Sequence, residues 1–60
     1  MKYYKIITED DELFFVENKC DISDEEVKEI AIDEGVADFY SMQTAIVEEI
    51  SENEYEERVD

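Results

Sequence analysis

The sequence contains no histidine, no tryptophan and no proline, and its 60 residues include a single glycine and a single cysteine. Without histidine, the Ser/His/Asp and Cys/His sets of nucleophilic catalysis are excluded, and so is an ordinary zinc site. The glycine-rich loops that bind phosphate are missing too. Cys20 has no second cysteine to pair with, which suits the reducing cytoplasm. We therefore expect no enzyme, no cofactor and no metal site.

Cationic side chains and long apolar runs are also scarce. Five Lys and Arg stand against 20 Asp and Glu, so the net charge is −15. Binding to nucleic acids and to anionic membranes depends on cationic side chains, so direct contact with either is not expected. The longest apolar run, residues 13–16, is too short for a signal peptide or a membrane span. The charge is uneven, because residues 1–20 contribute only −2 of it.

The composition nevertheless favours a folded chain. Hydrophobic residues make up 43% and aromatic residues 12%, whereas disordered chains are poor in aromatics and rich in proline. A domain of this size buries only about 60% of its unfolded surface, and self-repulsion of the charge opposes compaction. We expect one acidic domain over residues 1–60, and the sequence leaves open whether a homodimer supplies further burial.

Two strands are predicted in the first third of the chain, over residues 2–8 and 13–19, because both segments are rich in aromatic and β-branched residues. The acidic run 9–12 between them predicts a hairpin turn. Since this run lacks glycine, a tight primed turn is not expected.

The second strand is apolar on both faces. Leu13 and Phe15 point to one side, whereas Phe14 and Val16 point to the other. One helix can cover only one of these faces. The other face needs a second helix or a partner chain.

A helix is predicted from about Asp24 to Glu34. Ser23 and Glu26 have the spacing of a capping box, and Gly35 suits the left-handed position that ends a helix. The apolar stripe of this helix consists of Val27, Ile30 and Ala31.

The last third of the chain is harder to interpret. Ser51 and Glu54 repeat the capping-box spacing, which predicts a short helix to about Arg58. Residues 44–50 favour a third strand, although a helix also fits their pattern, and residues 36–43 give no clear signal. The expected fold class is α+β, with the order β-β-α-β-α and one well-capped helix packed on one face of an antiparallel sheet.

Acidic residues recur at every fourth position of the predicted helix, so they form one face with side chains about 6 Å apart. This spacing is similar to that of phosphates along a nucleic-acid strand. A net charge this large exceeds what solubility requires. A merely solvated helix face is the alternative interpretation. A weak cation site in the turn 9–12 is a further alternative. An apolar neighbour, Ile32, lies outside the buried stripe and suits a contact with a partner. The predicted partner-binding residues are Glu25, Glu26, Glu29, Ile32, Asp33, Glu48 and Glu49.

The aromatic hairpin (KYYKIIT and LFFVENK) followed by the capped helix ISDEEVKEI resembles the small acidic DNA-mimic inhibitors of phages and mobile elements. These include uracil-DNA glycosylase inhibitors, anti-restriction proteins and anti-CRISPR proteins. Over roughly residues 2–34 the order of elements is similar to that of one short dimeric family of phage glycosylase inhibitors. Membership of that family would imply a dimer that occupies the DNA groove of the glycosylase and captures an apolar side chain from it.

We therefore expect a non-enzymatic, cytoplasmic inhibitor that mimics the charge of nucleic acid and blocks the DNA- or RNA-binding surface of a basic host protein. The alternative is a small protein–protein interaction module, such as an antitoxin, an antagonist or an assembly factor. Such a module would bind through the apolar sheet face around Leu13 and Phe15.

Overall fold

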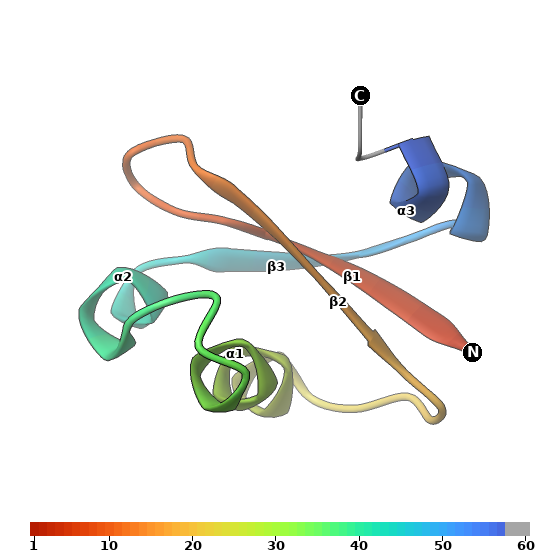
Figure 1. Ribbon diagram of the computed structural model, residues 1–60, viewed down its shortest axis with the longest axis horizontal. Helices are drawn as coiled ribbons and strands as arrows, with labels where there is room; N and C mark the ends of the chain where they lie inside the picture. Colours follow the sequence, from red (N-terminus) through yellow and green to blue (C-terminus); the bar gives the residue numbers. More distant parts are fainter. Residues whose placement is uncertain (58–60) are drawn as a thin grey trace.

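A three-stranded antiparallel sheet organises the chain, which we describe over residues 1–57 of a computed structural model. The strands are β1 (Lys2–Ile7), β2 (Leu13–Asn18) and β3 (Ile46–Ile50), and β1 is central in the order β2-β1-β3. Figure 1 shows α1 and α2 on one side of this sheet and α3 on the other. The predicted α+β class and the β-β-α-β-α order are confirmed, with one short additional helix, α2.

The core lies between the sheet and α1 (Asp24–Asp33). Side chains alternate along each strand, so Tyr4 and Ile6 of β1 face the helix, which buries Val27 and Ala31 against them. Ile6, Val27 and Ala31 have no exposed surface. Because the core is this small, each of its side chains accounts for a large share of the apolar burial.

The ends of α1 follow the predicted capping chemistry. The Ser23 hydroxyl accepts a hydrogen bond from the backbone N–H of Glu26, and it also donates to the Glu26 carboxylate at 3.4 Å. At the other end, Gly35 adopts a positive φ of 76° and Val36 N–H donates to the Ala31 carbonyl at 3.1 Å. This bond, with the one from Gly35 N–H to the Ile32 carbonyl, forms a Schellman motif. The helix itself ends at Asp33, one residue before the predicted end.

The turn between β1 and β2 is built without glycine. Asp11 takes the left-handed conformation instead, with φ of 63°. Its N–H donates to the Thr8 carbonyl, and Thr8 N–H donates to the Glu12 carbonyl. A residue in this conformation after the turn is typical of three-residue hairpin loops. The expectation that the turn is not a two-residue primed type is therefore confirmed.

A short helix, α3 (Glu52–Glu57), covers part of the second sheet face. It begins at Ser51, whose hydroxyl accepts from the N–H of Glu54 as predicted. Tyr55 packs on Tyr3, with ring centroids 4.7 Å apart, and lies edge-on to Phe15 at 6.4 Å. The second helix required by the apolar second face of β2 is thus present in the same chain. The predicted helix end at Arg58 lies outside the described residues.

One end of this second face stays uncovered. Ile7 pairs with Leu13 on one side and with Ile46 on the other, so the three aliphatic side chains form one row across the sheet. Leu13 is 52% exposed and Ile46 is 62% exposed. Within residues 1–57, α3 covers only the opposite end of this face.

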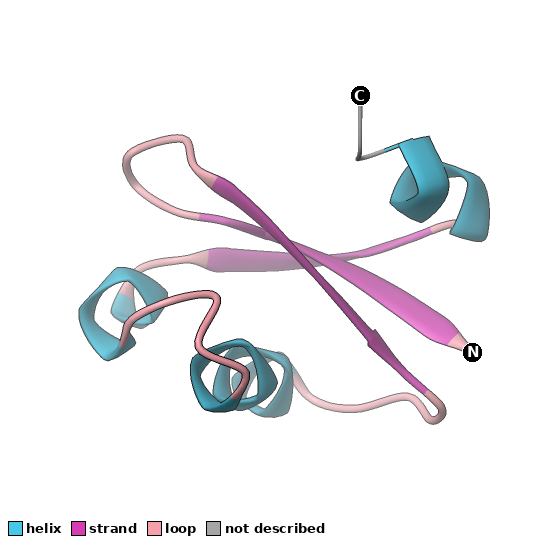
Figure 2. Ribbon diagram, in the orientation of Figure 1, coloured by secondary structure: helices cyan, strands magenta, loops and turns pink. Residues whose placement is uncertain are grey.

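The segment 36–43, whose structure could not be predicted, contains the helix α2 (Phe39–Gln43). Asp38 caps it by accepting from Ser41 N–H at 2.7 Å. Thr44 ends the helix and Ala45 is buried after it. The following segment is a strand rather than a helix, because pairing with β1 satisfies its backbone and packs Val47 against the core. The strand begins at Ile46, two residues later than predicted. Figure 2 shows the succession of α1, α2 and β3.

None of the helices within residues 1–57 has the length and apolar character needed to cross a bilayer.

Candidate protein-binding surface

The outward side of α1 carries three carboxylates, Glu25, Glu29 and Asp33, which we call the acidic face. All three residues are exposed and belong to successive turns of the helix. Ion pairs within residues 1–57 are limited to Lys2 with Glu49 and Lys5 with Glu48, so no residue of the acidic face is neutralised by one. The whole face is therefore available to a cationic partner.

Part of the acidic face opposes helix stability. Glu25 and Glu29, and likewise Glu29 and Asp33, are like charges four residues apart, and each such pair costs about 0.2–0.5 kcal/mol. The last turn of α1 contains Asp33 and no basic residue, whereas the helix dipole favours cations at that end. Glu25 lies in the first turn, where the helix dipole favours a carboxylate. The helix gains nothing from Asp33 in its last turn, and sequences that break a local rule in this way do so most often at functional sites.

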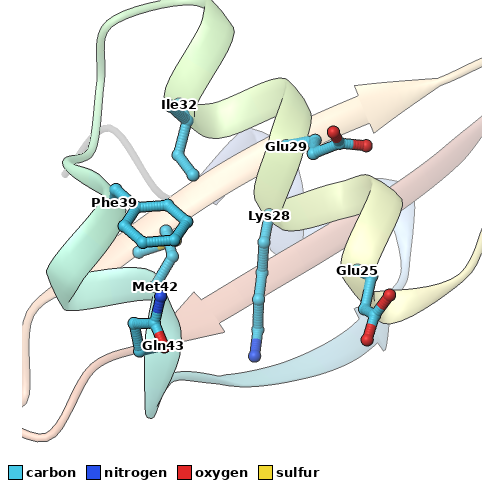
Figure 3. Close-up of a pocket in the computed structure, with 7 residues that line it drawn as sticks. All are labelled: Glu25, Lys28, Glu29, Ile32, Phe39, Met42 and Gln43. Atoms are coloured by element: carbon cyan, nitrogen blue, oxygen red, sulfur yellow. The ribbon is translucent and has the colours of Figure 1, made fainter.

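A hollow of about 260 Å³ lies between the acidic face and α2. Ile32, Phe39 and Met42 lie together in it, and Lys28 lies between them and the carboxylates of Glu25 and Glu29 (Figure 3). Ile32 is half-buried and packs against the core. The contact expected for Ile32 outside the buried stripe is thus made in part with α2 of the same chain.

The remaining predicted residues do not extend the acidic face. Glu26 takes part in the N-cap of α1 through Ser23. Glu48 and Glu49 are consecutive in a strand, so they point to opposite faces of the sheet. Glu48 lies 3.5 Å from the Lys5 ammonium and Glu49 lies 3.2 Å from the Lys2 ammonium. The hydrogen bond to Glu49 is the main reason that the pKa of Lys2 is raised.

Two exposed aromatic residues on α2 were missed by sequence reasoning. Phe39 is 60% exposed and Tyr40 is 84% exposed, with their rings edge-on at 6.0 Å. Exposed aromatic side chains are enriched at protein interfaces. The available signal was Asp38 followed three residues later by Ser41, but a five-residue helix shows too little periodicity to be recognised.

The cap of α2 predicts a pH-dependent step. Hydrogen bonds from the backbone and side chain of Ser41 lower the pKa of Asp38 from its ordinary value of 3.8. A lowered pKa means that the charged cap stabilises α2 at neutral pH and that this contribution is lost as the pH falls through the folded pKa, below 3.8. We expect the NMR shift of the Ser41 amide to titrate with a midpoint below 3.8.

The matched control is Asp38→Asn, because asparagine caps a helix without titrating. In this variant the step at Ser41 should disappear. A midpoint at or above the ordinary aspartate value in the original chain would show that the cap is not formed in solution.

Within residues 1–57, no group of three or more His, Cys, Asp or Glu side chains is arranged to hold a metal ion. Cys20 is exposed and has a free thiol. Comparisons with protein-family models, with curated proteins and with solved structures found no match to this chain.

Proposed function

We propose that this protein is a non-enzymatic acidic inhibitor that occupies the nucleic-acid-binding surface of a basic protein. The observation that carries the proposal is the acidic face. Its three residues are exposed, none of them belongs to an ion pair within residues 1–57, and Asp33 lies at the helix end where the dipole disfavours a carboxylate. A surface that binds nucleic acid presents cations in a row, and a row of fixed carboxylates competes for the same cations.

Solubility alone is a weaker explanation. A net charge of magnitude about 2–8 keeps a small domain soluble, and this chain carries −15. The charge lies on both sides of the sheet, because α3 also carries exposed carboxylates. The acidic face differs from those of α3 in its regular spacing along three successive turns of one helix.

The neighbouring hollow adds a second mode of recognition. Rows of charge raise the association rate and fix the orientation of a complex, whereas buried apolar contacts determine how long it lasts. Ile32, Phe39 and Met42 supply apolar surface directly beside Glu25 and Glu29. A partner held by the acidic face is thus in position for apolar contact.

The test is affinity capture from a host lysate with the immobilised chain at low and at high salt, followed by competition with duplex DNA. We expect basic nucleic-acid-binding proteins to be captured at low salt, released at high salt and displaced by DNA, since exposed charge pairs are strongly screened. Capture of proteins that neither salt nor DNA displaces would contradict the proposal.

That contrary result would favour the second candidate, a small protein–protein interaction module. The observation behind it is the uncovered aliphatic row of Ile7, Leu13 and Ile46. Leu13→Ser separates the two candidates. It should leave salt-sensitive capture unchanged, whereas it should abolish capture through the sheet face.

A further inference from the structure

We infer that the space between the β1–β2 turn and α2 is a seat for one arginine side chain of the basic partner. This inference rests on the proposed function and names the partner chemistry that the surface recognises. We call the space the turn hollow; it is lined by Thr8, Glu9, Asp10, Tyr40, Ser41 and Thr44. Its volume is about 200 Å³, less than the roughly 300 Å³ at which small-molecule pockets begin, so its size suits a side chain.

The aromatic wall is the first feature that selects arginine. Tyr40 is 84% exposed, the highest value among the large hydrophobic residues described. A ring this exposed contributes little to the core, and the parts of it that Phe39 does not contact are open to a partner. The planar guanidinium group of arginine stacks on aromatic faces better than a lysine ammonium does, and it is more weakly hydrated.

The polar wall is the second feature. Glu9 and Asp10 are exposed, and neither belongs to an ion pair within residues 1–57. Carboxylates beside a stacking surface match the several N–H donors of a guanidinium group. The hollow therefore combines an aromatic face with negative charge.

The hollow of about 260 Å³ between the acidic face and α2 provides the internal comparison. It contains Phe39 with Glu25 and Glu29, but it also contains Lys28. Lys28 is the only cationic residue between positions 21 and 57. Its ammonium opposes a second cation there, whereas the turn hollow is lined by no cationic residue. We expect the arginine to choose the Tyr40 side of α2.

The probe is a capped peptide with three arginines separated by glycines, titrated into the full chain and followed by NMR. We expect the largest shift changes at the Tyr40 ring and at the amides of Glu9, Asp10 and Ser41. Tyr40→Leu should weaken peptide binding about threefold, the size of an exposed cation–π contact. Tyr40→Phe keeps the ring and should bind like the original chain, and Phe39→Leu should have less effect than Tyr40→Leu. The lysine counterpart of the peptide should bind about threefold more weakly than the arginine peptide.

Equal binding by Tyr40→Leu and the original chain, or by the lysine and arginine peptides, would overturn the arginine seat. A charge reversal of the acidic face, tested with the captured partner, reports separately on the proposed function. Loss of the partner in that variant, with no effect of Tyr40→Leu, leaves the proposed function standing without the seat. Weaker binding by Tyr40→Leu, with no effect of the charge reversal, supports the arginine seat and contradicts the acidic face as the binding surface.

Discussion

Replacing Glu25, Glu29 and Asp33 together by lysine is expected to weaken binding to the basic partner by roughly 100-fold or more, while the fold survives. Each substitution changes the net charge by two, so the variant carries −9 instead of −15. All three side chains are exposed, and lysine has a high helix propensity. The affinity is measured by titration calorimetry at two salt concentrations, and circular dichroism verifies the helix content.

The matched control makes the same change of charge on the other side of the sheet. Glu54, Glu56 and Glu57 of α3 are exposed, and their replacement by lysine also gives −9. We expect this control to bind with a modest loss of affinity, because only long-range attraction is reduced. Equal losses in the two variants would mean that the partner senses total charge and not the acidic face.

Ile6→Ala is expected to unfold the protein or to leave it barely stable. Ile6 has no exposed surface, and it pairs with Phe14 and Val47 in the middle of the sheet. Truncating a buried isoleucine to alanine costs about 2–5 kcal/mol. A single core below about 70–80 residues rarely supplies more than 3–5 kcal/mol of stability, and the repulsion at −15 lowers it further. Thermal melting followed by circular dichroism measures the effect.

Ile7→Ala is the control for this prediction, because the next residue of the same strand points to the opposite face. Ile7 is only half-buried, in the row with Leu13 and Ile46, and we expect a loss of stability well below that of Ile6→Ala. Added salt should partly restore the folding of Ile6→Ala, since screening weakens the repulsion between carboxylates. Similar melting temperatures of Ile6→Ala and Ile7→Ala would contradict the assignment of Ile6 to the core.

The structure explains why some elements could be predicted and others could not. The ends of α1 depend on neighbours within a few residues, so Ser23, Glu26 and Gly35 revealed them. The start of α3 at Ser51 is equally local. The third strand was ambiguous because Ala45, Ile46 and Ile50 also fit a helical period, and only the pairing with β1 decides between the two structures.

Some residues of the candidate surface could be placed from the sequence, and others could not. Helical spacing alone places Glu25, Glu29 and Asp33 on one face. Sequence could not show that Glu48 lies beside Lys5 and Glu49 beside Lys2, because those contacts depend on strand register.

The sequence by itself determined three features of this protein. The scarcity of cations sets the charge, and the absence of histidine limits the expected chemistry. Residues a few positions apart determine the capped acidic helix. Tertiary structure alone decided that α3 covers half of the second sheet face through Tyr55. It also decided that α2 presents Phe39 and Tyr40 beside two groups of carboxylates. The physical reason is that both arrangements join segments distant in the chain, and their packing depends on which surfaces the sheet leaves uncovered.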